Sequence, residues 1–173
     1  MRRSGDRTAA RTQDVAVSLY LNGERHATTV PPWYTLLDLL RFGFGLRGTK
    51  ESCREGACGA CTVLLDGHPI NACLMLAASA HGRSVTTIEG LTTVDRPHPL
   101  QEAFVESGAI QCGYCSPGML VAASALLKAR PMPTEDEIRR WLSGNLCRCT
   151  GYAKIVEAVR LASQRLISTT PER

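Results

Sequence analysis

The residues of this 173-residue chain that are best suited to chemistry are its eight cysteines, which fall into two groups of four. The first group has the spacing C-x4-C-x2-C-x11-C and the second has the spacing C-x2-C-x31-C-x-C. Four thiolates can share two iron atoms, and the first three cysteines have the spacing of plant-type 2Fe-2S ligands. The sequence therefore predicts two 2Fe-2S clusters, one on Cys53, Cys58, Cys61 and Cys73, and one on Cys112, Cys115, Cys147 and Cys149.

Zinc is the main alternative metal, because C-x2-C pairs are common zinc ligands. A structural zinc site usually combines two pairs of the C-x2-4-C type. Here the first group has three cysteines in one short loop and a distant fourth, and the second group ends in C-x-C. The spacing favours clusters at both places, more strongly at the first, while a disulfide framework is disfavoured in a cytosolic chain.

The residues around the cysteines fit an anionic cluster, which needs N–H donors directed at its sulfur atoms. Gly48, Gly56 and Gly59 allow the first loop to curl tightly and point its amides inward. In the second group, Ser116 and Pro117 form an N-cap and first-turn pair, so we expect the positive end of a helix to face the cluster.

Composition and charge indicate an ordinary globular protein, with 44% hydrophobic and 21% charged residues. The net charge is +4, and four arginines and one aspartate in residues 1–13 supply +3 of it. Residues 14–173 therefore carry a net charge of only +1, so a nucleic-acid partner is not expected. The apolar runs of the chain are too short to cross a bilayer. Arg2 and Arg3 lack the apolar stretch of ~7–15 residues that an export signal needs, so we expect a cytoplasmic location.

The elements expected in the first half are mainly strands. Alternating apolar residues predict a hairpin over 15–30 that turns at Asn22-Gly23, and a second hairpin over 62–70 that turns at Asp66-Gly67. A short helix is expected over 35–40, and a last strand over 84–88.

Helical periodicity begins near Leu100 and continues through four expected helices, which include one that starts at Ser116 and one with a Thr134/Glu137 capping box. The sequence thus predicts an α+β chain with a basic flexible tail at 1–13, a ferredoxin-like 2Fe-2S domain at 14–90 and a helical 2Fe-2S domain at 91–173.

The four histidines show no ligand spacing and are expected at the surface. Tyr114 and Tyr152 are expected to exclude water from the second cluster by packing.

Three motifs in this order, ESCREGACGACTVLLDG, QCGYCSPGM and GNLCRCTGY, resemble the small iron–sulfur subunit of the xanthine oxidase family of molybdenum hydroxylases. The resemblance covers about residues 14 to 165 and all eight cysteines. It implies a β-grasp plant-type ferredoxin domain followed by a four-helix bundle. It also implies an electron-transfer role, in which single electrons pass from a molybdenum-pterin centre through both clusters to FAD.

The resemblance further implies partners: a large molybdopterin-binding subunit and a medium FAD-binding subunit, assembled as a dimer of heterotrimers. It implies that the helical-domain cluster lies nearer the pterin, with Gln111 and Cys149 beside it. Two other functions stay open from the residues alone, a free-standing two-cluster ferredoxin and a zinc-stabilised interaction module. The substrate site is expected on another subunit.

Overall fold

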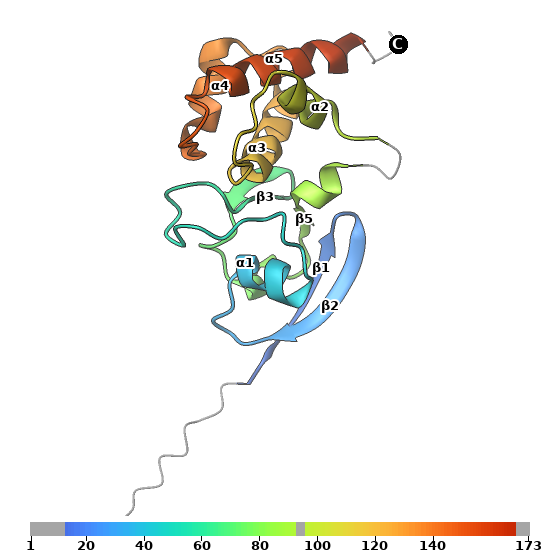
Figure 1. The fold of residues 1–173 in the computed structure, drawn as a ribbon. Helices are drawn as coiled ribbons and strands as arrows, with labels where there is room; N and C mark the ends of the chain where they lie inside the picture. Colours follow the sequence, from blue (N-terminus) through green and yellow to red (C-terminus); the bar gives the residue numbers. More distant parts are fainter. Residues whose placement is uncertain (1–12, 93–95, 169–173) are drawn as a thin grey trace, which may run out of the picture.

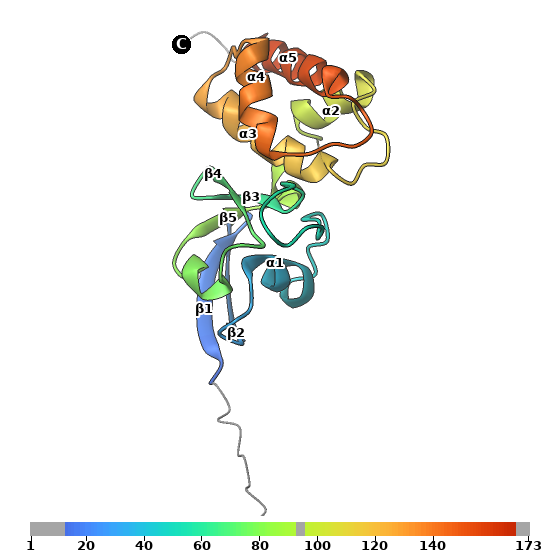
Figure 2. The same cartoon turned by 90° about the vertical axis from the view of Figure 1, so that its left-hand side faces the viewer.

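The computed structural model describes residues 13–92 and 96–168, so most of the expected N-terminal tail lies outside the described residues. It has a sheet-containing part and a helical part that stack end to end along the long axis of the molecule (Figures 1 and 2). No helix in the described ranges is long and apolar enough to cross a membrane. The expected mixture of a sheet domain and helices is confirmed.

The first part is a five-stranded mixed sheet in the order β2-β1-β5-β3-β4, with α1 packed beside it. Only the β1–β5 pair is parallel among the described strands. Both predicted hairpins are confirmed, and Asn22 and Asp66 each have a positive φ at the turn. The bounds are β1 (Val15–Leu21), β2 (Glu24–Val30), α1 (Leu36–Asp38), β3 (Thr62–Leu65), β4 (His68–Asn71) and β5 (Ser84–Thr86).

Two local predictions for this part need correction. The short helix expected over 35–40 has its predicted Thr35–Asp38 capping box, but it continues as a π-helical turn over Leu39–Gly43. The last strand ends at Thr86, because Ile88 begins a 3₁₀ turn over Ile88–Leu91. That turn leads out of the sheet toward the helices.

The helical part contains α2 (Pro99–Glu106), α3 (Ser116–Ala129), α4 (Glu135–Trp141) and α5 (Ala153–Ser168). Helix α3 is buried along most of its length, as its nearly uniform apolar character predicts. The Thr134/Glu137 capping box is confirmed at the start of α4. Helix α3 begins at Ser116, but its N-cap is Cys115, so the expected cap was wrong by one residue.

Each part has its own hydrophobic core, and a small cluster joins them. The sheet core includes Cys61 and Cys73, whereas the helical core is centred on residues such as Phe104 and Met119. Leu64 of β3 packs with Val121 and Ala125 of α3 at the junction. This contact sets the cysteine loop before β3 against the N-terminal end of α3 (Figure 2).

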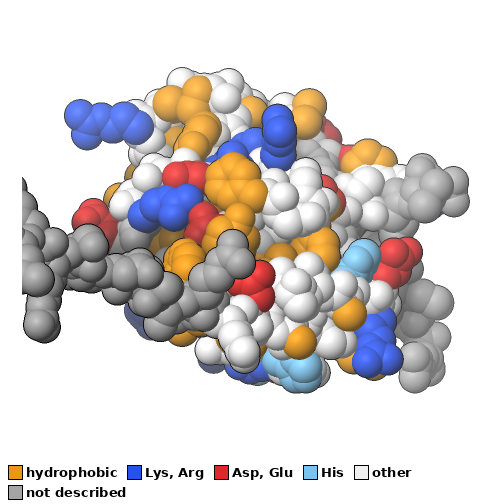
Figure 3. Space-filling model, turned by 90° about the horizontal axis from the view of Figure 1, so that it is seen from below, with side chains coloured by type: hydrophobic (Ala, Val, Ile, Leu, Met, Phe, Trp, Pro, Cys, Tyr) orange, Lys and Arg blue, Asp and Glu red, His pale blue; other side chains and the backbone are white. Residues whose placement is uncertain are grey.

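The end of the molecule opposite the helices carries a mixed surface. On the visible part of this face, hydrophobic side chains lie among acidic and basic ones (Figure 3). The positive charge of the described residues is thus interspersed with negative charge there.

Candidate iron–sulfur sites

The first cysteine group lies at the edge of the sheet core. Cys53, Cys58 and Cys61 belong to the irregular segment before β3, and Cys73 follows β4. Cys61 and Cys73 are buried, whereas Cys53 and Cys58 are half-buried. The β3–β4 hairpin brings the distant fourth cysteine back to the loop, because Ala72 donates its N–H to the Cys61 carbonyl at 3.3 Å.

The four thiols of this group interact as two neighbouring pairs. Burial raises the pKa of Cys61 to about 12, and the Cys73 thiol beside it adds to the rise. The backbone N–H of Glu55, the Cys58 thiol and the N–H groups of Cys58 and Ala57 lower the pKa of Cys53 to about 7. The loop therefore directs amide donors at a sulfur atom, which is what an anionic cluster needs.

Glycine has two different roles in this loop. Gly56 and Gly59 have φ values of +79° and +69°, so they permit the tight curl that the sequence predicts. Gly48 does not have a positive φ; instead, a Cβ there would lie 2.3 Å from Ile88 Cγ2. The expectation of a curl at Gly48 was wrong, and this glycine permits close packing against the 3₁₀ turn.

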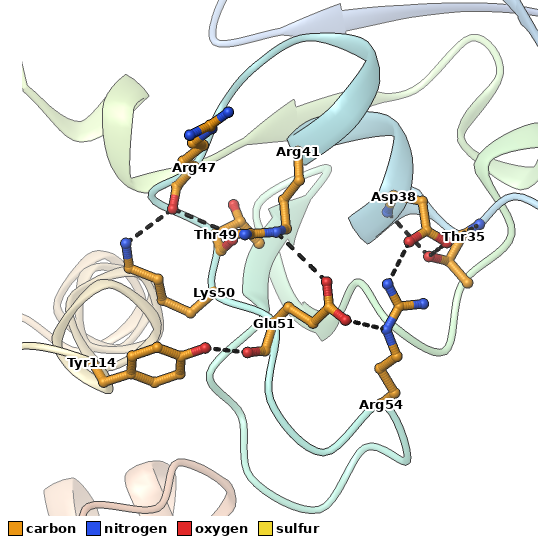
Figure 4. Close-up of polar contacts among 9 residues, drawn as sticks. All are labelled: Thr35, Asp38, Arg41, Arg47, Thr49, Lys50, Glu51, Arg54 and Tyr114. Carbon is orange, nitrogen blue, oxygen red and sulfur yellow. Dashed lines mark hydrogen bonds and ion pairs between the residues drawn. The ribbon is translucent and has the colours of Figure 1, made fainter.

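An ion-pair network braces the loop against α1 (Figure 4). Arg54, which follows Cys53 with a φ of +56°, donates to Asp38 Oδ1 at 2.7 Å and to Glu51 Oε1 at 2.6 Å. Burial alone would raise the pKa of Asp38, but hydrogen bonds from Thr35 and Arg54 hold it below its usual value. Helix α1 thereby anchors a residue directly beside a cysteine of the first group.

A second part of the same network supports the base of the loop (Figure 4). Arg41 donates to the Thr49 carbonyl at 2.8 Å, and Lys50 donates to the Arg47 carbonyl at 3.0 Å. The hydroxyl of Tyr114 donates to the Glu51 carbonyl, although the tyrosine itself comes from the second cysteine group. Tyr114 therefore links the two cysteine loops, and its side chain is 48% exposed.

The second cysteine group lies at the start of α3 and in the segment before α5. Cys112 and Cys149 are exposed, and their sulfur atoms are 3.6 Å apart. Cys115 and Cys147 are half-buried neighbours, and burial followed by the nearby Cys147 thiol raises the pKa of Cys115 to about 12. The structure thus brings all four predicted cysteines together, with an outer pair and an inner pair.

Thr150 supplies side-chain and backbone donors to this second group. Its hydroxyl lies 3.2 Å and its N–H 3.4 Å from Cys147 Sγ. Burial alone would raise the pKa of Cys147, but the Thr150 hydroxyl and amide and the Cys149 amide lower it to about 7. Sequence reasoning did not assign this role to Thr150, although a hydroxyl residue directly after C-x-C was the available signal.

Two other residues differ from the sequence prediction. The Tyr152 hydroxyl accepts the N–H of Cys147 at 2.8 Å, so this tyrosine bonds to the site in addition to packing against the core. His98 is half-buried rather than at the surface as expected, and its Nδ1 accepts the Leu100 N–H at the start of α2. Gln111 is exposed and directly precedes the exposed Cys112 in the chain.

Both groups fit a 2Fe-2S cluster. Thiols that neighbour each other in pairs match a two-iron unit, in which each iron takes two protein sulfurs. Among residues 13–92 and 96–168, no three His, Cys, Asp or Glu side chains are grouped so that they could hold one metal ion.

The fold and the two sites define an iron–sulfur protein of the electron-transfer class. Residues 19–84 match the model of a 2Fe-2S iron–sulfur cluster binding domain, and residues 87–160 match that of a [2Fe-2S] binding domain. The chain is 51% identical over 151 residues to the nicotinate dehydrogenase small FeS subunit of Eubacterium barkeri, covering 87% of this chain and 96% of the relative.

Two solved structures of oxidoreductases share the fold of this chain. Quinoline 2-oxidoreductase from Pseudomonas putida 86 superimposes with a TM-score of 0.87 at 42% identity, over 91% of this chain and 98% of the matched chain. The aldehyde oxidoreductase from Desulfovibrio desulfuricans superimposes with a TM-score of 0.86 at 41% identity, over 90% of this chain but 18% of that chain. The chain belongs to the family of small iron–sulfur subunits of the molybdenum hydroxylases.

Proposed function

We propose that this chain is the electron-transfer subunit of a molybdenum hydroxylase, passing single electrons from a molybdenum-pterin centre through two 2Fe-2S clusters to FAD. When bound, each cluster accepts and releases one electron at a time. The observation that carries the proposal is the assembly of two separate cysteine quartets in one molecule. The chain would contribute no catalytic residue, since the substrate site would lie on another subunit.

The sulfur pairs support a specific ligand assignment. In the first site, Cys53 and Cys58 would hold one iron, and Cys61 and Cys73 the other, because these thiols are neighbours. In the second site, Cys112 and Cys149 would share one iron, and Cys115 and Cys147 the other. The amides of the first loop and the hydroxyl of Thr150 would stabilise the negative charge of the thiolates.

The exposure of the second site supports a large partner subunit that covers it. Cys112 and Cys149 are exposed, although cluster ligands are usually protected from bulk water. A molybdopterin-binding subunit docked here would exclude that water, with Gln111 and Cys149 beside the pterin. The matched Desulfovibrio desulfuricans chain is far longer than this one, so there the same two-part fold works within a larger polypeptide.

The remaining assignments follow from family membership. We propose a medium FAD-binding subunit on the side of the first cluster, a dimer of heterotrimers and a cytoplasmic location, where reduced thiols favour metal ligation. The fold would be a β-grasp domain over 14–90 followed by a four-helix bundle over 91–173. The related proteins are named for nicotinate, quinoline and aldehyde, in keeping with a substrate pocket outside this chain.

Purification of the native protein under anaerobic conditions tests the proposal. We expect it to co-elute with two larger chains that carry molybdenum and flavin, and to contain about four iron atoms per copy of this chain. Two distinct paramagnetic signals should appear on reduction. Elution of this chain alone with both clusters would instead support a free-standing ferredoxin, and a colourless zinc-containing protein would support an interaction module.

A further inference from the structure

Asn145 is a buried polar residue that joins the two cysteine loops. It follows the 3₁₀ turn Leu142–Gly144, lies two residues before Cys147 and is 6% exposed. Its side-chain amide donates to the Gly59 carbonyl and to Thr62 Oγ1, both at 3.0 Å. Both acceptors belong to the first part of the molecule, so each bond crosses from the helical part to the sheet part.

The backbones meet around this side chain with no room for other side chains. A Cβ on Gly59 would lie 2.3 Å from the Gly144 carbonyl oxygen, and a Cβ on Gly118 would lie 2.4 Å from the Gly59 carbonyl oxygen. Next to them, the Leu146 N–H donates to the Cys58 carbonyl at 2.9 Å. The main chains of the segments that carry Cys58 and Cys147 are therefore in direct contact around Asn145.

The first loop does not need Asn145 to satisfy its own hydrogen bonds. The Gly59 carbonyl also accepts the Thr62 N–H at 3.1 Å and the Thr62 hydroxyl at 2.7 Å. Removing the Asn145 amide would leave these bonds within the loop in place. The contribution that is lost is the side-chain connection between the two parts, while the backbone bond from Leu146 to Cys58 remains.

We propose that Asn145 is a positioning residue that fixes the separation and relative orientation of the two clusters, and so sets the rate of electron transfer between them. This inference rests on the proposed function. Electron transfer between two centres depends steeply on their distance, so a small displacement of the two loops changes the rate. A buried amide with both bonds across the junction prevents such displacement, because breaking them leaves a buried donor unpaired.

The test compares Asn145→Ala with wild type in the whole complex. Asn145→Ala should keep about four iron atoms and both paramagnetic signals. The magnetic interaction between the two reduced clusters should weaken. Reduction of the flavin by substrate should be slower than in wild type, because the electron crosses between the displaced clusters on its way to the flavin.

Asn71→Ala is the matched control. The Asn71 side-chain amide donates to the Gly56 carbonyl of the same loop at 3.0 Å, but this bond stays within the first part. We expect Asn71→Ala to leave the interaction between the clusters unchanged. An equal weakening in both variants would overturn the inference, because the effect would then come from a loosened loop.

The other possible results of these experiments distinguish a failure of the inference from a failure of the proposed function. Unchanged magnetic interaction and flavin reduction in Asn145→Ala would overturn the inference while leaving the proposed function intact. If Asn145→Ala loses iron, Asn145→Asp replaces it, because aspartate keeps the side-chain volume. Weakened magnetic interaction in Asn145→Asp with both clusters present would support the inference. Loss of iron from Asn145→Asp, or an unchanged magnetic interaction, would overturn it. Wild-type protein without two clusters would instead refute the proposed function.

Discussion

The two cysteine sites differ in how the protein protects them. In the first site, Cys61 and Cys73 belong to the sheet core and none of the four cysteines is fully exposed. In the second site none is fully buried, and Cys112 and Cys149 lie at the surface. The difference supports our proposal that a partner subunit covers the second site, whereas the fold of this chain encloses much of the first.

The sites also differ in the source of their hydrogen-bond donors. The first uses backbone amides of a curled loop, which α1 holds in place through the Asp38–Arg54 ion pair. The second uses the side chain of Thr150 together with backbone amides. We therefore expect substitutions of single side chains to alter the second site directly and the first site through its support.

The largest expected effect is that of Cys149→Ser. Loss of an outer ligand should remove the second cluster, reduce the iron content from about four to about two atoms and abolish turnover, while the first cluster keeps its signal. Iron analysis and paramagnetic resonance of the reduced complex measure this. Turnover at the wild-type rate would contradict the proposed electron route, and simultaneous loss of both signals would contradict the independence of the two sites.

Asp38→Asn should weaken the support of the first loop. It removes the charge of Asp38, which is buried but pairs with the 44% exposed Arg54. After allowance for solvent screening, we expect a loss of about 1–2 kcal/mol in the free energy of unfolding. Denaturant unfolding, monitored by the visible absorption of the clusters, measures it. Arg83 pairs with Asp66 at the surface away from both sites, so Asp66→Asn is the comparison variant and should cost less.

The same carboxylate gives a pH dependence. The folded pKa of Asp38 is lowered relative to its ordinary value, so its stabilising contribution is present above the unfolded pKa of about 3.9 and is lost as the pH falls through the folded pKa. The stability difference between wild type and Asp38→Asn should therefore shrink when the pH falls from about 5 toward 3. A difference that is constant over this range would show that the charge of Asp38 does not matter.

Thr150→Val should shift the reduction potential of the second cluster downward. The lost hydroxyl donor stabilises the more negative, reduced state by about 1 kcal/mol, which corresponds to about 40 mV for one electron. A redox titration followed by paramagnetic resonance measures both clusters at once, so the first cluster is the internal control. An equal shift in both potentials would contradict a direct bond to Cys147 as the cause.

The smallest expected effect is that of Tyr114→Phe. It removes the hydroxyl that bonds to the Glu51 carbonyl but keeps the ring, and the carbonyl is near solvent, so we expect a loss of about 0.5–1 kcal/mol. Thermal unfolding measures the change, with Tyr20→Phe as the control, since the Tyr20 side chain on β1 is similarly exposed, at 49%. A loss as large as that of Asp38→Asn would mean that the link between the loops matters more than the support from α1.

Local patterns allowed much of the fold to be predicted. Asn22-Gly23 and Asp66-Gly67 predict their hairpins because these pairs tolerate positive φ. The Thr35/Asp38 and Thr134/Glu137 boxes predict two helix starts because each box involves residues three apart. The end of β5 and the N-cap of α3 were misplaced by one or two residues, since competing packing and turn geometry decide such boundaries.

The amino-acid sequence by itself determined the number of cysteine groups, their membership and the kind of metal centre they suit, because ligand type and spacing are properties of the chain. Only the tertiary structure decided which sulfurs are neighbours, which pair is exposed and how Asn145 reaches Gly59 across 86 positions. Those features depend on the approach of the sheet to α3, and contacts between segments far apart in the chain form only when both cores have packed.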